Sequence, residues 1–302
     1  MKVLIIGYGS IGRRHEEVLS KIDEIKSVNI VTKQSVDNKK TFNDIKKVND
    51  IQSYDYFVIA SETNKHYAQL IYLETNVTDK IIFCEKPLFE INKDLTIEKN
   101  QVFVGYVLRF HPILQKLKSF LENEKVLSVN VNCGQYLPTW RPNTDYRDSY
   151  SAKKDEGGGV LLDLSHEIDY IQWLFGIMKE IKSYQLKISD LEIDSDDLTT
   201  FIGKTDKEVI INLSIDYISK ITYRKMLIHT LNNTYALDFL KNNLIQKDKM
   251  GVEQVFSFAN LERNYMFEQM HKSILSHKES VCSYDEGLKV MNTISIIQEQ
   301  NK

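Results

Sequence analysis

A run of glycines near the start of this 302-residue sequence has the spacing of a nucleotide-binding turn. Gly7, Gly9 and Gly12 follow the apolar, β-rich residues 3–6 and precede a stretch with apolar residues at helical intervals. In the dinucleotide fingerprint, one glycine makes the tight turn and another lets backbone N–H groups approach a pyrophosphate. The third lets the helix pack on the strand. A lone glycine turn is the alternative, and the flanking strand and helix favour dinucleotide binding.

A candidate catalytic lysine lies in Cys84-Glu85-Lys86-Pro87, at the end of a strand predicted over residues 80–85. Ligands of open α/β sheets bind beyond the carboxyl ends of the strands, so Lys86 is expected to project into the cofactor crevice. Pro87 permits a cis peptide bond, which would fix the direction of Lys86. Taken alone, Glu-Lys-Pro is also a common surface tripeptide.

A candidate proton-transfer group lies in a helix predicted over residues 160–175, after three consecutive glycines at 157–159 that allow close backbone approach to a ligand. Asp163, His166 and Asp169 recur every three residues, which predicts one shared helix face. A nearby carboxylate raises the pKa of a histidine, so His166 could hold a proton near neutral pH. A structural histidine is the alternative. The spacing matches no standard zinc signature, even with His111, and we predict no metal site.

The residues expected to meet the adenosine ribose are Thr32, Lys33 and Gln34, at the end of a strand predicted over residues 27–32. A carboxylate at this place would grip the ribose hydroxyls of NAD. A hydroxyl and an ammonium instead suit a 2′-phosphate, which favours NADP over NAD. In the alternative, Lys33 is a solvated loop residue and Asp37 reaches the ribose.

A candidate substrate loop covers residues 136–147 and contains Trp140, Arg141, Tyr146 and Arg147. Two prolines stiffen this loop. Aromatic faces stack on sugars or bases, and arginine forks bind phosphates or carboxylates. The alternative is a loop that packs on its own domain.

The elements that would position these residues fall into two groups. Short buried strands alternate with helices up to residue 105, which indicates βαβ units on a parallel sheet. Longer strands joined by polar turns follow from about residue 126, which indicates an antiparallel or mixed sheet. The predicted strands are 3–6, 27–32, 56–60, 80–85 and 101–105, then 181–188, 198–203, 208–217, 222–231 and 234–240. The other predicted helices are 64–74, 261–277 and 285–298.

Composition restricts the classes of partner and compartment. The length suits two domains, and a formal net charge of −3 gives no reason to expect nucleic acid or an anionic membrane as partner. No run approaches the roughly 18 apolar residues of a membrane span. The three cysteines, Cys84, Cys133 and Cys282, are far apart, which is typical of reduced thiols in a cytoplasmic protein.

The motifs together resemble the Gfo/Idh/MocA family of oxidoreductases. The resemblance rests on the glycine turn followed by Arg13-Arg14-His15, on Glu85-Lys86-Pro87, and on residues 157–169. It extends to Arg109-Phe110-His111-Pro112 and to Arg263-Asn264-Tyr265-Met266, and so covers nearly the whole chain. It implies an α/β fold with a doubly wound parallel Rossmann domain over residues 1–108. An α+β domain with a large open, mainly antiparallel sheet is expected over 109–302, with helix 285–300 packing back on the Rossmann domain.

The resemblance also implies which residues form the site. It implies that Lys86 and His166 are catalytic with Asp163 alongside. This sequence has D-x-x-H where many members have D-x-x-x-H, so Asp169 could replace Asp163. Glu62-Thr63-Asn64 stands where Thr-Pro usually precedes the histidine equivalent to His66, which either reaches the cofactor or lies on a helix surface. The expected cofactor-binding residues are Gly7, Tyr8, Gly9, Ser10, Ile11, Gly12, Thr32, Lys33, Ser61, His66, Glu85 and Lys86. The expected substrate-binding residues are Arg109, Trp140, Arg141, Tyr146, Asp163 and His166.

The implied activity is hydride transfer between NADP, or NAD, and a secondary hydroxyl or keto group of a sugar or sugar nucleotide in surface-glycan synthesis. The family also implies a homodimer or homotetramer formed through the C-terminal sheet. A non-catalytic dinucleotide sensor is the alternative function. A sensor has no need of Lys86 and His166 together, which favours the enzyme.

Overall fold

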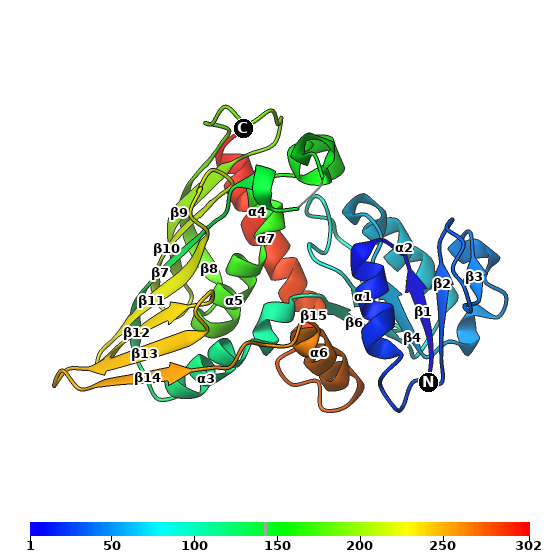
Figure 1. Cartoon of the computed structure of the whole chain (residues 1–302), viewed down its shortest axis with the longest axis horizontal. Helices are drawn as coiled ribbons and strands as arrows, with labels where there is room; N and C mark the ends of the chain where they lie inside the picture. Colours follow the sequence, from blue (N-terminus) through cyan, green and yellow to red (C-terminus); the bar gives the residue numbers. More distant parts are fainter. Residues whose placement is uncertain (142–143) are drawn as a thin grey trace. The chain divides into compact units, whose positions relative to one another are not determined.

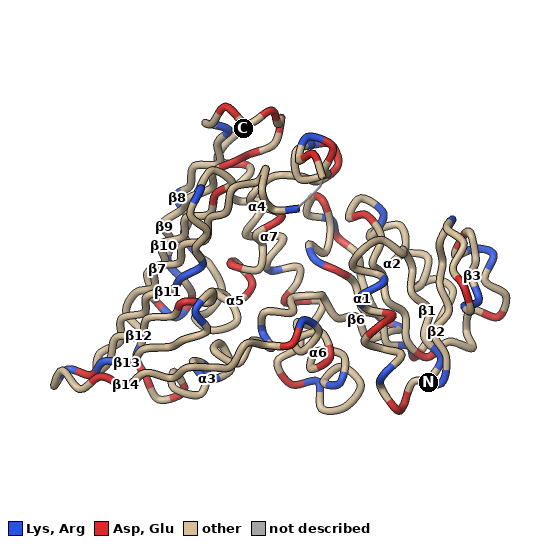
Figure 2. Tube along the Cα trace, viewed as in Figure 1, with Lys and Arg blue, Asp and Glu red and all other residues tan. Residues whose placement is uncertain are grey.

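The computed structural model describes residues 1–141 and 144–302 (Figure 1). Pro142, part of the predicted substrate loop, lies outside the described residues. The chain forms two compact units. The first contains residues 1–110 and 262–291, and the second contains residues 111–261 and 292–302. Lys and Arg are interspersed with Asp and Glu along both units (Figure 2), in keeping with the formal net charge of −3.

The first unit contains a seven-stranded sheet in the order β15-β6-β5-β4-β1-β2-β3. All neighbouring strands are parallel except β15, which is antiparallel to β6. The central strands are buried at every residue except Lys2, the first of β1, as expected of a sheet covered on both faces. This confirms the predicted Rossmann sheet. The strands are β1 (Lys2–Ile6), β2 (Ser27–Val31), β3 (Thr41–Phe42), β4 (Tyr56–Ile59), β5 (Ile81–Cys84), β6 (Gln101–Val104) and β15 (Cys282–Ser283).

Helices α1 (Ser10–Leu19) and α2 (Thr63–Asn76) follow β1 and β4, as the βαβ pattern requires. Helix α6 (Tyr265–Leu275) completes the core of this unit from far along the chain. Its Phe267, Met270 and Ile274 are buried in one cluster with residues of β1 and α1. The core of the first unit therefore depends on residues after 261.

The second unit contains an eight-stranded sheet in the order β14-β13-β12-β11-β7-β10-β9-β8. It is mainly antiparallel, as predicted, with one parallel pair between β7 and β10. Strands β13 and β14 are absent from the predicted set. The strands are β7 (Val126–Gly134), β8 (Met178–Leu186), β9 (Leu198–Thr205), β10 (Ile210–Asp216), β11 (Tyr223–Thr230), β12 (Asn233–Asp238), β13 (Asn243–Asp248) and β14 (Glu253–Ser257).

The two faces of this sheet differ in exposure. Alternate residues such as Val131, Leu213 and Ile228 are buried on one face. Their neighbours on the other face include apolar side chains that are exposed, among them Ile202 and Val255. One face thus packs on the core of the second unit and the other keeps apolar groups in solvent.

The predicted helix over residues 160–175 is wrong in one respect, because it is two helices. Helix α4 (Val160–Asp163) ends at Leu164, whose backbone angles (φ −98°, ψ 27°) leave the helical region, and α5 (His166–Phe175) begins two residues later. Asp163 therefore ends one helix and His166 begins the next, so they do not share the face of a continuous helix. The second unit also contains α3 (Pro112–Leu121) and the end of α7 (Tyr284–Gln300), which begins in the first unit. Among the helices described, none is long and apolar enough to cross a bilayer.

Candidate active site

The glycine turn between β1 and α1 is fixed by close packing at two of its three glycines. Gly7 has a positive φ of 97°, and a Cβ there would lie 2.5 Å from the backbone nitrogen of Ser61. A Cβ at Gly12 would lie 2.2 Å from the carbonyl oxygen of Gly7. Both positions therefore require glycine, the first for the turn and the second for helix packing.

Gly9 differs, because a Cβ there would meet no atom within 4 Å. It is the N-cap residue of α1, and the first turn of that helix contains no acidic side chain. Backbone N–H groups of a first helical turn lack partners within the helix and favour anions. The space beside Gly9 therefore fits the pyrophosphate of a dinucleotide, with Tyr8, Ser10 and Ile11 around it in sequence.

The end of β2 is joined to α1 by an arginine. The Gln34 backbone N–H donates to Thr32 Oγ1 at 3.1 Å, and Arg13 Nη2 donates to Gln34 Oε1 at 2.7 Å. The Arg13 guanidinium also lies over the ring of Tyr8, 5.2 Å from its centroid. Arg13, known from the sequence only as part of the family motif, is thus fixed to the Thr32-Lys33-Gln34 segment through its last residue, Gln34.

The neighbouring Arg14 contacts α6 and the residues before it. Its Nε donates to Asn264 Oδ1 at 3.0 Å, and its guanidinium donates to the carbonyl of Arg263. The same guanidinium lies 4.2 Å from the ring centroid of Phe267. Arg14 is therefore an internal anchor of the first unit, whereas Arg13 lies at the predicted cofactor end.

The Glu85-Lys86-Pro87 turn follows β5 and contains a cis peptide bond between Lys86 and Pro87. The Lys86 backbone N–H donates to Glu85 Oε2 at 3.0 Å. Glu85 Oε1 lies 2.8 Å from His15 Nε2. The side chain of Glu85 therefore acts inside the unit, and its two oxygens connect α1 to the backbone of Lys86.

His66 lies on α2 beneath the same turn and is buried, with 1% of its surface exposed. Its Nδ1 is 3.2 Å from the carbonyl oxygens of Pro87 and Leu88, and its Nε2 is 3.2 Å from the carbonyl oxygen of Ser61. Burial lowers the pKa of this histidine. The interpretation of His66 as a surface residue is wrong, because its ring connects the Lys86 turn to the end of β4.

Arg109 is almost fully buried in the first unit, with 2% exposed. Its Nη1 donates to the carbonyl oxygen of Val281 at 3.1 Å and to Glu286 Oε1 at 3.0 Å. These contacts tie the short helix over residues 107–110 to β15 and α7. They are internal contacts of the unit.

In the second unit, Asp163 is buried and its Oδ2 accepts a 2.6 Å hydrogen bond from the hydroxyl of Tyr217. Tyr217 follows β10 and is completely buried, and the ring of Trp140 packs edge-on against it at 5.1 Å. Burial and the Asp163 carboxylate both raise the pKa of Tyr217, and burial followed by the same carboxylate raises that of Tyr150. Two tyrosines that the sequence analysis missed therefore surround this aspartate.

His166 and Asp169 lie on α5, one turn apart, and Asp169 is completely buried. Asp163 lies across the break, at the end of α4. Among the described residues, no group of three or more His, Cys, Asp or Glu side chains could hold a metal ion.

Two of the three glycines before α4 make room for the unit's own atoms. A Cβ at Gly158 would lie 2.1 Å from the carbonyl oxygen of Tyr150, and one at Gly159 would lie 2.0 Å from Asp196 Oδ1. Asp196 Oδ2 accepts the Leu161 backbone N–H at 3.0 Å, within the first turn of α4. At Gly158 and Gly159 the chain closely approaches itself, and the expected approach of a ligand to this segment stays a prediction.

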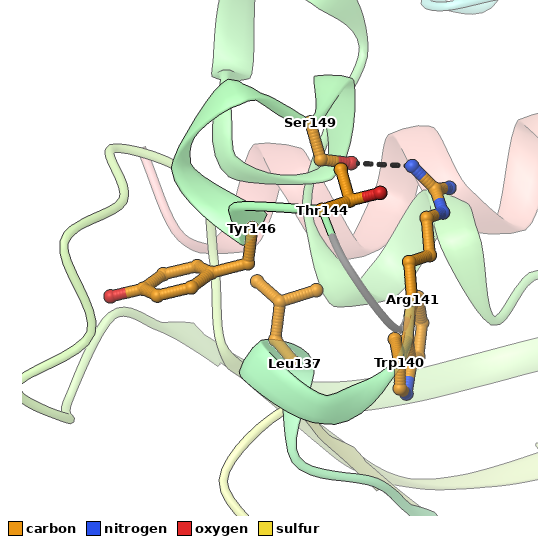
Figure 3. A pocket seen from close by; sticks show the side chains of 6 residues that line it. All are labelled: Leu137, Trp140, Arg141, Thr144, Tyr146 and Ser149. Carbon is orange, nitrogen blue, oxygen red and sulfur yellow. Dashed lines mark hydrogen bonds between the residues drawn. The ribbon is translucent and has the colours of Figure 1, made fainter.

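Figure 3 shows side chains of the predicted substrate loop together with Ser149, which follows the loop. Arg141 Nη1 donates to Ser149 Oγ at 2.7 Å, and its guanidinium lies over the ring of Tyr150 at 5.2 Å. The Tyr146 ring points away from Arg141 (Figure 3), and its hydroxyl accepts the Glu192 backbone N–H at 3.2 Å. The hollow between these residues has a volume of about 10 Å³, enough for about one water molecule. A sugar does not fit inside it.

Comparisons with known proteins agree with the fold. Residues 1–104 match the model of the oxidoreductase family with an NAD-binding Rossmann fold, and residues 115–234 match that of the GFO/IDH/MocA C-terminal domain. A search of curated proteins finds no match to the sequence.

Solved structures with the same fold have low sequence identity to this chain. UDP-N-acetylglucosamine 3-dehydrogenase from Acidithiobacillus ferrooxidans is 16% identical with a TM-score of 0.77, over 100% of this chain and 97% of that one. Levoglucosan dehydrogenase in complex with NADH and levoglucosan is 15% identical with a TM-score of 0.84, over 99% and 96%. A super-repressor mutant of Gal80p from Saccharomyces cerevisiae is 14% identical with a TM-score of 0.83, over 100% and 95%. With both of its family models matched in order along the sequence, the chain belongs to the Gfo/Idh/MocA family of NAD(P)-dependent oxidoreductases.

Proposed function

We propose that this protein transfers a hydride between NADP and a secondary hydroxyl or keto group of a sugar or sugar nucleotide. The observation that carries the proposal is within the first unit. Open space beside Gly9 lies at the N-terminus of α1, and Lys86 follows β5 of the same parallel sheet. Cofactors of such sheets bind at the carboxyl ends of the strands, where both residues lie. The structures of two sugar dehydrogenases with this fold support the substrate class.

The proposed roles follow from the chemistry of alcohol oxidation, which removes a hydride and a proton. The nicotinamide, when bound, accepts or supplies the hydride. His166 takes or returns the proton of the hydroxyl. The Lys86 ammonium stabilises the negative charge that develops on the substrate oxygen.

The carboxylate partner of His166 is proposed to be Asp163 or Asp169. The hydrogen bond from Tyr217 supports Asp163, because it fixes the direction of that carboxylate. Trp140 and Arg141 are proposed to position the substrate, since they contact the two tyrosines around Asp163. Arg109 and Tyr146 stay predictions, because the contacts described for them lie within their own units.

The preference for NADP over NAD is proposed from the charges at the end of β2. Lys33 and Arg13 are cationic, and Arg13 is fixed to this segment through Gln34. Residues 32–34 include no carboxylate to bind the 2′-hydroxyl of NAD. A 2′-phosphate would gain charge-assisted hydrogen bonds from both cations.

The test begins with fluorescence titrations of NADPH and NADH, followed by a panel of sugar nucleotides and acidic sugars under both cofactor oxidation states. Lys86→Met and His166→Asn are expected to lower turnover at least about 100-fold while the fold is retained. Lys241→Met and His277→Asn change exposed residues of the same types and serve as matched controls. Turnover that survives both active-site changes would refute the assignment. Tight cofactor binding without turnover on any sugar would favour the alternative, a dinucleotide sensor.

We also propose that the exposed face of the second sheet joins copies of the chain. Ile202, Leu227 and Val255 are 56%, 37% and 56% exposed, and strand register aligns them in one row across the sheet. Light scattering should give a dimer or tetramer, and Leu227→Asp should dissociate it. A wild-type monomer at micromolar concentration would rule this out.

A further inference from the structure

Four buried side chains of the first unit form one continuous series of hydrogen bonds that the proposed reaction does not use. The Tyr56 hydroxyl lies 2.8 Å from His271 Nδ1, and His271 Nε2 lies 2.8 Å from His15 Nδ1. His15 Nε2 lies 2.8 Å from Glu85 Oε1. Tyr56, His15 and His271 are each 0% exposed, and Glu85 is 8% exposed. The series joins β4, α6, α1 and the Lys86 turn.

The chemistry of each group fixes the direction of the hydrogen bonds. An ionised Glu85 can only accept, so His15 Nε2 must carry a hydrogen. A neutral His15 then accepts at Nδ1 from the Nε2–H of His271. His271 in turn accepts at Nδ1 from the Tyr56 hydroxyl. Every polar atom of the series is satisfied with both imidazoles neutral and both protonated at Nε2.

An added proton would break this arrangement. A proton on either histidine puts a hydrogen on His271 Nδ1, which then points at the Tyr56 oxygen. The Tyr56 hydroxyl hydrogen would lose its acceptor in the protein interior, at a cost of about 1–3 kcal/mol. Burial lowers the pKa of His271, which favours the neutral form of that ring.

The surroundings of the pair are apolar and closed. The rings of Phe83 and Phe267 pack edge-on against His15 at 5.0 and 5.4 Å, and Phe83 also contacts His271. Arg14, His66 and Cys84 are also near Glu85, since the charge of Glu85 acts on the pKa of each, and Lys86 follows Glu85 in the chain. The series begins at Glu85 and ends at the fully buried Tyr56, so it does not lead from Glu85 to a second exposed group. Its hydrogen bonds fix the geometry of the four groups that they join.

That geometry includes the backbone of Lys86. Glu85 Oε1 is held by His15, and Glu85 Oε2 accepts the Lys86 backbone N–H at 3.0 Å. His66 approaches the same turn from α2, through the carbonyl oxygens of Pro87 and Leu88. A carboxylate fixed at both oxygens orients the peptide between Glu85 and Lys86, and hence the start of the lysine side chain.

We propose that His15 and His271 are positioning residues for Lys86, acting as a neutral pair of fixed tautomers through the carboxylate of Glu85. The proposal rests on the proposed function for the role of Lys86 in the reaction. The hydrogen-bond arrangement itself does not depend on that function, and it can be tested without a substrate.

The first experiment determines the tautomers by NMR of protein labelled with ¹⁵N at histidine. His15 and His271 should each show a protonated Nε2 and an unprotonated Nδ1 between pH 6 and 8. Tyr56→Phe removes a single hydroxyl, and it should shift the Nδ1 resonance of His271 while His15 keeps its tautomer. An imidazolium, or a hydrogen on Nδ1 of either ring, would overturn the assignment.

The second experiment tests the link to Lys86 by a double-mutant cycle, read out as affinity for NADPH and, where the sugar panel gives turnover, as kcat and KM. His271→Gln should weaken NADPH binding or lower kcat by about 10-fold in the wild type and by less than about 2-fold in Lys86→Met. His277→Gln, on an exposed histidine after α6, is the matched control and should change neither. Tyr56→Phe repeats the cycle should His271→Gln fail to fold.

Failure of the positioning proposal and failure of the proposed function give different results. Additive effects of the His271 and Lys86 changes would show that the pair acts without Lys86, even if the tautomers are correct. Failure of every sugar to turn over would count against the proposed function alone, because the tautomers and the NADPH cycle are still measured.

Discussion

One methyl group added at Gly9 is expected to weaken cofactor binding strongly and leave the fold intact. The backbone of Gly9 has φ −74° and ψ −163°, which any residue adopts. No protein atom lies within 4 Å of the added Cβ. The methyl group would therefore occupy the space that the pyrophosphate needs, and nothing else.

The size of the effect follows from the contacts that are lost. Hydrogen bonds from N–H groups to a charged acceptor contribute about 1.5–3 kcal/mol each, so losing one weakens binding about 10- to 150-fold. Alanine is a poorer N-cap than glycine, and we expect Gly9→Ala to lower the free energy of unfolding by less than about 1 kcal/mol. Affinity and stability thus separate at this position.

Gly12→Ala is the contrasting variant. Its Cβ would lie 2.2 Å from the carbonyl oxygen of Gly7, so α1 must move away from β1. Overpacking of this kind costs about 1–3 kcal/mol, and we expect a clear loss of stability. NADPH fluorescence titration and urea unfolding of both variants give the comparison. Wild-type NADPH affinity in Gly9→Ala, or equal destabilisation by the two changes, would refute the reasoning.

Three further predictions concern the second unit. Tyr217→Phe removes one hydrogen-bond donor to the buried Asp163 carboxylate, and we expect a stability loss of about 1–3 kcal/mol in urea unfolding and a shifted pH–rate profile. An unchanged profile would separate Asp163 from proton transfer. Burial lowers the pKa of His111 to about 4, against about 6.5 when unfolded. The unfolded state therefore binds the extra proton between these values, and stability should fall by about 3 kcal/mol as pH drops from about 6.5 to 4. His111→Asn should flatten this slope in urea unfolding, and an equal slope in the variant would contradict the assignment. Arg224→Met leaves the fully buried Glu167 carboxylate without its 2.6 Å partner, and should lower the free energy of unfolding by about 3–5 kcal/mol. Adding Glu167→Gln should restore part of this stability. No recovery in thermal unfolding would show that the Arg224 change acts through lost packing and not through the unpaired charge.

The strands of the first sheet could be predicted because their local pattern is unambiguous. Residues 3–6 and 56–59 are apolar without interruption, and each is buried along its length. Strands β13 and β14 could not be predicted in the same way. They lie at the edge of the second sheet, where of their residues only Leu244 is fully buried. A strand with one core-facing side chain leaves no alternating pattern in the sequence.

The break between α4 and α5 could not be predicted for a different reason. Leu164 and Ser165 are neither proline nor glycine, and apolar spacing continues through them, so the sequence predicts one helix. The contact that fixes the start of α4 is equally invisible in the local sequence, because Asp196 lies 35 residues away from Leu161, whose N–H it accepts. Tyr217 and His271 were missed for the same reason. Their partners Asp163 and His15 lie 54 and 256 residues away, beyond the reach of any local pattern.

The place of α6 in the first unit has a consequence for how the protein is made. A ribosome releases residues 1–110 long before it reaches residues 262–291, which complete the same unit. Until then His15 has no His271, Arg109 has no Glu286, and the apolar surface that receives Phe267 is open to water. The first unit therefore cannot complete its core until the whole second sheet has been synthesised. Until then we expect it to be an incomplete intermediate of the kind that chaperones recognise. A fragment cut after residue 110 is expected to behave in the same way.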